Sequence, residues 1–212
     1  MLARRADAME RVRGLSGMLR QSRADQAAQA SRFNALKDRE AWREKVVVSD
    51  NLFPTPPEIA QRLVELAGLS YGMHVLEPSC GTGRIVEAIA PHVDTLNLTV
   101  DACEISPPLL ADCQRRFPFL AGAPGDFLQF STPHGYDRII MNPPFRMGAD
   151  IRHILQAKNL LAIGGKVVSL CYDGTRQNRD LRPLCDTWEV LPAGSFKSEG
   201  TGAGVVLLTI SI

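Results

Sequence analysis

Val75-Leu76-Glu77-Pro78-Ser79-Cys80-Gly81-Thr82-Gly83-Arg84 is the stretch that determines the predicted fold. It opens with an apolar run typical of a short buried strand that ends in the carboxylate Glu77. Gly81 and Gly83 follow, and glycine lets the backbone turn tightly and approach a ligand closely. The stretch therefore predicts a strand, a glycine-rich turn and a helix that begins at a ligand.

This turn has three competing interpretations. A phosphate-binding loop requires Gly-Lys-Ser/Thr, and no such tripeptide follows. A dinucleotide site requires a third glycine, but Ile85-Val86 occupies that point. A tight turn without a ligand remains open on this segment alone.

Helices and strands alternate on both sides of the turn. We expect strands at His74–Pro78, before Gly125, and at Leu96–Cys103, Tyr136–Met141, Lys166–Cys171, Trp188–Leu191 and Val205–Ile212. We expect a helix after Pro57 and further helices at Arg84–Ala90, Pro107–Arg116 and Asp150–Ala162. This alternation predicts an α/β fold, a Rossmann-like doubly wound sheet of seven mostly parallel strands. The last two strands lie close together in the sequence, which predicts an antiparallel C-terminal hairpin.

Residues 1–48 differ from the rest and are predicted to form a basic helical extension to a domain over residues 49–212. Residues 1–45 contain eleven Lys/Arg against six Asp/Glu and no proline. Their apolar positions make only a thin stripe, which favours packing on the body, on a ligand, or on a second subunit as a homodimer.

Composition excludes several classes of protein. The formal net charge is only +1, so the whole chain has no strong electrostatic signature for nucleic acid. The five cysteines show no zinc-ligand spacing, and their odd number argues against a disulfide framework. We expect a reduced cytoplasmic protein without a metal site. We expect neither secretion nor membrane insertion, because no apolar segment follows the early arginines and no apolar run reaches the ~18 residues that a membrane span needs.

Acidic residues follow the next two strands. Glu104, in Val100-Asp101-Ala102-Cys103-Glu104-Ile105, can accept hydrogen bonds from ribose hydroxyls, although a solvated carboxylate is the alternative. Asp126 could accept from an adenine amine while Phe127 packs on its ring. The alternative for this pair is a helix N-cap and a core phenylalanine, and the sequence does not decide between them.

Asn142-Pro143-Pro144-Phe145 directly follows the expected strand that ends at Met141. An exocyclic aromatic amine is a poor nucleophile, because its lone pair is delocalised into the ring. The Asn142 side-chain oxygen and the Pro143 carbonyl can hold its N–H groups, and the two prolines preorganise the loop. Phe145 can stack on a planar substrate. A structural Asn-Pro-Pro turn is the alternative, and its position after the fourth strand disfavours it.

Together with Phe53-Pro54-Thr55-Pro56, these motifs resemble the class I S-adenosylmethionine-dependent methyltransferases, in particular the N6-adenine and related amino-methyltransferases. Met141–Ile154, Gly164-Gly165-Lys166 and Leu191–Lys197 also resemble small methyltransferases of bacterial, phage and plasmid genomes. The resemblance covers about residues 50–212.

The resemblance implies S-adenosyl-L-methionine as cofactor, nucleic acid as substrate, and a role for each matching position. Thr55 and its loop would bind the methionine end of the cofactor. The group of Glu77, Ser79, Cys80, Gly81 and Gly83 would form the cofactor cradle, although a small buried residue is the simpler interpretation of Cys80. Glu104 with Ile105 would contact the ribose side, and Asp126 with Phe127 the adenine. Asn142 to Phe145 would hold the target amine, with Asn142 also bordering the cofactor.

Two alternatives to adenine methylation stay open. The chain has no block large enough for the target-recognition domain usual in restriction methyltransferases, which puts sequence-specific duplex recognition in doubt. A protein glutamine side-chain amide poses the same electronic problem as adenine and is the second candidate substrate. A cofactor-binding protein without catalytic activity, acting through its N-terminal helices, is the third hypothesis.

Overall fold

The computed structural model describes residues 53–200 and 202–212, which belong to a compact unit spanning Asn51–Ile212. The predicted helical extension, its boundary with the body and its use as a dimer contact lie outside the described residues. All of these remain predictions.

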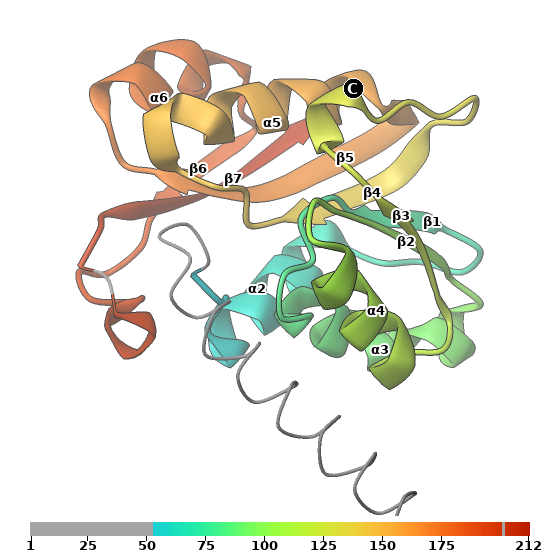
Figure 1. Cartoon of the computed structure of the whole chain (residues 1–212). Helices are drawn as coiled ribbons and strands as arrows, with labels where there is room; N and C mark the ends of the chain where they lie inside the picture. Colours follow the sequence, from blue (N-terminus) through green and yellow to red (C-terminus); the bar gives the residue numbers. More distant parts are fainter. Residues whose placement is uncertain (1–52, 201) are drawn as a thin grey trace, which may run out of the picture. The chain divides into compact units, whose positions relative to one another are not determined.

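A seven-stranded sheet forms the centre of this unit, in the order β3-β2-β1-β4-β5-β7-β6 (Figure 1). The first five strands pair in parallel, and β7 runs antiparallel to both β5 and β6. The predicted Rossmann-like sheet with its antiparallel C-terminal hairpin is therefore confirmed. The strands are β1 His74–Glu77, β2 Thr99–Glu104, β3 Leu120–Pro124, β4 Tyr136–Met141, β5 Leu161–Tyr172, β6 Thr187–Val190 and β7 Val205–Ser211.

Helices cover both faces of the sheet (Figure 1). One face carries α2 Pro57–Ala67, α3 Arg84–Leu96 and α4 Pro107–Arg116, and the other carries α5 Ala149–Asn159 and α6 Thr175–Asp180. Short 3-10 turns are η1 Phe127–Gln129, η2 Arg146–Gly148, η3 Arg182–Leu184 and η4 Lys197–Glu199.

Each face has its own hydrophobic cluster, because successive strand residues point to opposite sides. Along β4, Ile140 packs into the cluster under α2 and α3, which we call the α2-side cluster. Ile139 and Met141 pack into the cluster under α5, the α5-side cluster. The α2 helix presents Ile59, Leu63 and Ala67 to the sheet, all buried and spaced along one helical stripe.

Two predicted helix ends were wrong. The helix that begins at Arg84 continues past Ala90 to Leu96, so Leu96 is the last residue of a helix and not the first of a strand. Buried Ile89 and Val93, one turn apart, hold this helix on the sheet despite Pro91, and Asn97 ends it at a φ of 49°. The helix expected to reach Ala162 ends at Asn159, because β5 already begins at Leu161.

Among the described residues, no helix is both long and apolar enough to span a membrane. The same part of the chain contains no group of three or more His, Cys, Asp or Glu side chains arranged for a metal ion.

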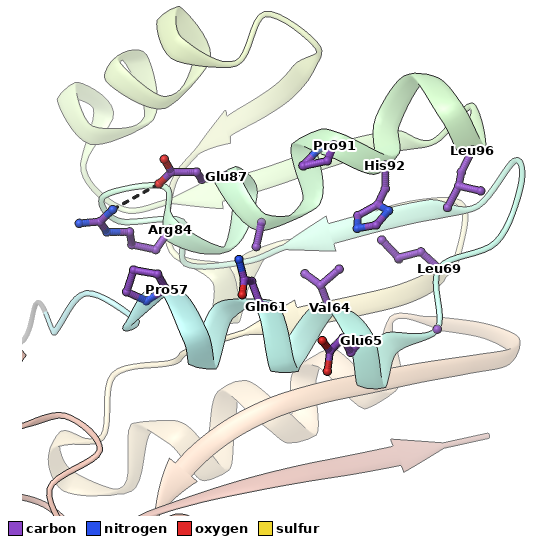
Figure 2. A pocket seen from close by; sticks show the side chains of 12 residues that line it. Pro57, Gln61, Val64, Glu65, Leu69, Arg84, Glu87, Pro91, His92 and Leu96 are labelled. Carbon is purple, nitrogen blue, oxygen red and sulfur yellow. Dashed lines mark hydrogen bonds and ion pairs between the residues drawn. The ribbon is translucent and has the colours of Figure 1, made fainter.

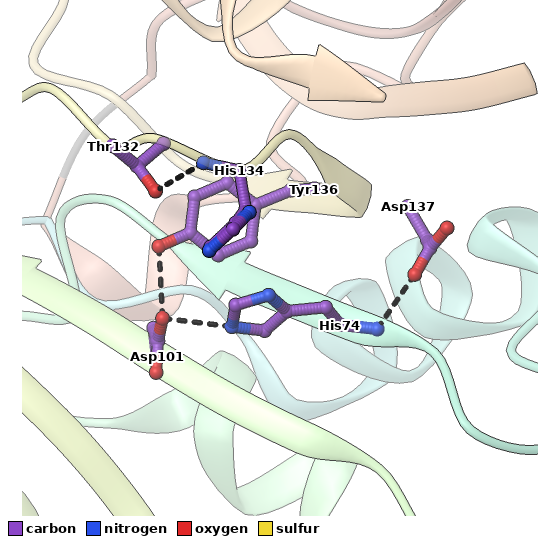
Figure 3. Close-up of polar contacts among 6 residues, drawn as sticks. All are labelled: His74, Asp101, Thr132, His134, Tyr136 and Asp137. Atoms are coloured by element: carbon purple, nitrogen blue, oxygen red, sulfur yellow. Dashed lines mark hydrogen bonds and ion pairs between the residues drawn. The ribbon is translucent and has the colours of Figure 1, made fainter. Parts of the chain in front are cut away.

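A polar cluster joins three strands at the start of β1 and β4 (Figure 3). Asp101 of β2 accepts from the Tyr136 hydroxyl and lies against His74 Nε2, both at 2.8 Å through Oδ2. The His74 and Tyr136 rings lie 4.5 Å apart. Burial, and then the hydrogen bond to Asp101, raises the pKa of Tyr136 above its ordinary value. The cluster lies at the amino ends of β1 and β4, opposite the carboxyl ends where ligand sites usually form in such sheets.

We expect Tyr136→Phe to lower the free energy of unfolding by about 1.5–3 kcal/mol, the contribution of a hydrogen bond to a charged acceptor. Because the pKa of Tyr136 is raised in the folded state, the stability that it adds is present below pH 10 and is lost as the pH rises further. Urea unfolding of both proteins from pH 7 to pH 11 measures this. A difference between them that does not shrink above pH 10 would contradict the assignment.

Candidate active site

The carboxyl ends of β1, β2 and β4 meet at one edge of the sheet. In the parallel register Glu77 lies beside Ala102 of β2, while Leu76 lies beside Ile139 of β4. Glu77 and Glu104 end their strands, and Asn142 follows the last residue of β4. Three predicted site residues from distant parts of the sequence are thus brought to one place, the usual position of ligand sites in such sheets.

The glycine-rich turn has the geometry that its glycines allow. Gly81 and Gly83 have φ values of 48° and 79°, in the left-handed region, and Gly83 caps the start of α3. The Gly83 N–H donates to the Cys80 carbonyl at 2.7 Å. A Cβ atom at Gly83 would lie 2.9 Å from Cys113 Sγ. Both backbone conformation and space therefore require glycine at Gly83.

Glu104 fixes this turn against β2. Its Oε2 accepts from the Gly81 N–H and its Oε1 from the Ser106 N–H, both at 2.9 Å. The side chain is buried, so the alternative of a solvated carboxylate is wrong. Each oxygen keeps further acceptor capacity, and the predicted contact with a ribose is not tested by these bonds.

Glu77 differs from the other residues of the site because its carboxyl group is buried without full hydrogen bonding. It is 1% exposed, and its Oε2 has no hydrogen-bond partner among the residues that the structure describes. Burial, followed by the nearby Cys113 and Glu104, raises the pKa of Glu77 well above its ordinary value, although a bond from the Ser79 backbone partly opposes this. An unpartnered buried acceptor is costly, which makes this position a candidate for binding a ligand donor.

A small cavity separates the glycine-rich turn from the segment before α2. It is lined by Pro54, Thr55, Glu77, Ser79, Cys80, Gly81, Thr82, Arg84, Ile85 and Asn142. Its volume is about 20 Å³, room for about one water molecule. Six predicted site residues thus line one cavity, and a larger ligand enters it only if the covering segment moves.

The amide of Asn142 has a defined orientation. Its Nδ2 donates to the Phe53 carbonyl and to Thr55 Oγ1, both at 3.1 Å. A carbonyl oxygen can only accept, so the NH₂ group must face this segment. The Asn142 Oδ1 therefore remains as an acceptor on the other side of the amide.

The residues after Asn142 differ in exposure. Pro143 is buried, whereas Pro144 and Phe145 are half-buried, and Phe145 packs against the α2-side cluster. Met147 is 79% exposed and has a φ of 56°, rare for a residue with a side chain. Much of the Phe145 ring is therefore already in contact with protein.

Asp126 and Phe127, the predicted adenine contacts, both make contacts within the protein. Asp126 caps η1 by accepting from the Leu128 N–H at 2.9 Å, and Phe127 is a core residue of the α5-side cluster. An N-cap aspartate and a core phenylalanine are the roles that the structural alternative predicted. Because Phe127 is buried, its ring has no free face on which an adenine could pack. Ile105 is 73% exposed and can give an apolar surface to a ligand.

Cys80 is buried in the turn, which confirms the simpler interpretation of this residue. A hydrogen bond with Cys113, and then burial, raises the pKa of its thiol. A raised pKa disfavours the thiolate, so these surroundings do not favour Cys80 as a nucleophile.

Sequence reasoning missed Asp150, which is fully buried. Its carboxylate accepts from the backbone N–H groups of Ile151 and Tyr172, both at 3.0 Å. It also accepts from Gln177 Nε2 at 2.9 and 3.1 Å. Asp150 thereby joins the start of α5 to the end of β5 and to α6. An acidic residue at a helix start was the only local signal, and it is too common to be diagnostic.

A larger groove of about 700 Å³ lies between α2 and α3 (Figure 2). Its lining mixes apolar side chains such as Val64 and Leu69 with the ion pair of Arg84 and Glu87. Arg84 borders both this groove and the small cavity. The predicted catalytic residues are absent from its lining.

Solved structures of methyltransferases share this architecture. TrmN from Thermus thermophilus superposes with a TM-score of 0.59 at 23% identity over 74% of this chain and 49% of its own. A putative RNA methyltransferase from Pyrococcus horikoshii gives 0.60 at 19% identity over 75% and 85%. The N-methyltransferase NodS from Bradyrhizobium japonicum, in complex with S-adenosyl-l-homocysteine, gives 0.59 at 18% over 79% and 95%.

The chain has the fold of these methyltransferases. Because the identities are low, the comparison establishes the fold alone, and the chain spans about half the length of TrmN. No protein-family profile matches the sequence.

We expect Gly83→Ala to destabilise the protein by about 1–2 kcal/mol of backbone strain plus the cost of displacing Cys113. Gly68→Ala is the matched control, because Gly68 also has a positive φ, of 60°, but has open space where a Cβ would lie. Urea unfolding measures the loss of stability in both variants. The difference between them is the cost of the contact between the new Cβ atom and Cys113, because both variants carry the backbone strain. Equal losses in the two variants would show that the Cys113 contact is unimportant.

Proposed function

We propose that this protein is an S-adenosylmethionine-dependent methyltransferase that modifies an exocyclic amino nitrogen, with adenine N6 in DNA or RNA as the first candidate. The proposal is carried by the orientation of the Asn142 amide. Its Nδ2 donates two hydrogen bonds to the segment before α2, so its Oδ1 remains available as an acceptor beside the cavity.

The residues around the cavity suit this cofactor. The unpartnered Glu77 Oε2 would accept from the cofactor's ammonium group, and the backbone at Gly81 and Gly83 leaves room for close approach. Glu104 and the exposed Ile105 would lie at the ribose and base, with Asp126 near the base edge. S-adenosyl-l-homocysteine bound to NodS, which has the same fold, supports this choice. When bound, the cofactor supplies the electrophilic methyl group.

The residues of this chain would then position the amine. Asn142 Oδ1 accepts one N–H and the Pro143 carbonyl the other, which favours a pyramidal nitrogen with an available lone pair. Pro143 and Pro144 restrict the loop, so these acceptors need little reorganisation. Transfer is a direct displacement, so orientation supplies most of the catalysis. The nitrogen loses its extra proton to solvent afterwards.

Charge distribution supports nucleic acid as the substrate. Residues 142–185 contain seven Lys/Arg against three Asp/Glu, although the chain as a whole is almost neutral. Arg146 follows the Asn-Pro-Pro-Phe run and is exposed, as is Arg176. The Arg176 guanidinium lies 3.6 Å from the position of a Cβ at Gly148, so it borders the same loop. A basic rim beside the target site suits a phosphate backbone.

We expect labelled S-adenosylmethionine to transfer its methyl group to adenine in single-stranded DNA, duplex DNA or RNA, and Asn142→Ala to lower kcat at least about a hundredfold. Calorimetry should show cofactor affinity retained within a few-fold. Label in a protein extract instead of nucleic acid would favour a glutamine side chain. Cofactor binding without label in any substrate would favour a protein that binds the cofactor without catalysis.

We expect the double variant Arg146→Gln/Arg176→Gln to weaken oligonucleotide binding and to reduce its salt dependence by about two released counterions. Arg115→Gln on α4 is the matched control, since Arg115 is exposed and α4 covers the face of the sheet opposite to α6. Fluorescence anisotropy from 50 to 300 mM salt measures both slopes. An unchanged slope in the double variant would remove these arginines from the substrate surface.

A further inference from the structure

The last residue of β5 is an exposed aromatic side chain at the same edge of the sheet as Asn142. Tyr172 ends β5 and is 43% exposed. In the parallel pairing of β4 with β5, Met141 lies opposite Ser169, so Tyr172 extends the sheet edge two residues beyond the level of Asn142. At about 3.3 Å per residue, this projects Tyr172 roughly 7 Å further toward solvent.

Tyr172 lies on the same side of the sheet as Asn142. It pairs with Val205 of β7, and both Val205 and Leu170 belong to the α2-side cluster. Side chains alternate along a strand, so Tyr172 lies on the same side of the sheet as Leu170.

Asn142 lies on this side as well. It follows Met141 of the α5-side cluster, so its own side chain points to the opposite face, and it bonds to Phe53 and Thr55, just before α2. The aromatic ring and the amide therefore face the same space above the edge.

The backbone around Tyr172 is held firmly. Its N–H donates to the buried Asp150 carboxylate at 3.0 Å, and the Asp173 N–H donates to the Gly204 carbonyl at 2.9 Å. A Cβ at Gly174 would lie 2.8 Å from Tyr172 Cδ1, so the ring rests against this glycine on one side. Asp150 also holds Ile151 at the start of α5, next to the loop that follows Asn142. Tyr172 and that loop are thus fixed to one buried group.

We propose that Tyr172 is the aromatic surface on which the target base stacks while its amino group is held by Asn142. Phe145, the residue predicted for this role, packs against the hydrophobic core, whereas the Tyr172 ring has a large free area. A flipped base needs one aromatic or apolar face beside the groups that bind its edge. The proposal rests on the proposed function and identifies a residue that determines specificity for a planar substrate.

The test is steady-state methyl transfer to whichever adenine oligonucleotide the wild-type protein methylates. Base–aromatic stacking is worth about 1–3 kcal/mol, so Tyr172→Ala should raise KM about tenfold or more. Tyr172→Phe should remain within about twofold of the wild type, and Tyr172→Leu should fall between them. Tyr71→Ala is the matched control, because Tyr71 is 75% exposed in the loop that enters β1 at the opposite edge.

A second readout separates stacking from a structural role. Cofactor affinity should be unchanged in Tyr172→Leu, and a 2-aminopurine at the target position should be quenched by the wild type and less so by Tyr172→Leu. An active wild type with unchanged KM and quenching in Tyr172→Ala and Tyr172→Leu would overturn the stacking role and leave the proposed function intact. A wild type that methylates no oligonucleotide would overturn both.

Discussion

The parallel pairing of β1 with β2 on one side and β4 on the other is the constraint on which the rest of the site depends. It brings together a glycine-rich turn, a carboxylate that shapes this turn and an amide that follows β4. The bond from the Gly81 N–H to Glu104 fixes the turn to the neighbouring strand end. A one-residue shift of β1 would exchange the sides of all its residues and separate these groups.

The two buried carboxylates at this edge, Glu104 and Glu77, differ in their hydrogen bonding. Both Glu104 oxygens accept backbone N–H groups, so its burial is compensated. Within the described part of the chain Glu77 lacks a partner at Oε2, and Cys113 and Glu104 further disfavour its charge. An unpartnered acceptor costs about 1–3 kcal/mol, which a strand end selected only for stability would avoid. A ligand that donates to Glu77 recovers this energy on binding, so the strain in the unbound protein favours complex formation.

The sequence predicted the fold and the strand-end residues because both depend on local patterns. Strand–helix alternation, the paired glycines and the Asn-Pro-Pro run are each contained in a few residues. The contacts of Phe127, Phe145, Asp150 and Tyr172 depend on tertiary packing that no local pattern specifies. All three aromatic residues, Phe127, Phe145 and Tyr172, look alike in the sequence. Which of their rings are covered depends on how the helices pack on the sheet.

The true end of α3 was missed because buried Ile89 and Val93 outweigh the helix-breaking tendency of Pro91.

The orientation of one amide connects the proposed cofactor side of the site to the proposed substrate side. Turning the Asn142 amide over would place its Oδ1 against the Phe53 carbonyl, where no hydrogen bond can form, while the Thr55 hydroxyl could still donate to it. At a net value of about 1 kcal/mol for the one bond lost, the observed orientation is favoured roughly fivefold in population. The acceptor that would hold the target amine is therefore preorganised by the same segment that covers the small cavity. A ligand that displaces Thr55 must keep or replace these bonds, since otherwise Oδ1 loses its fixed direction.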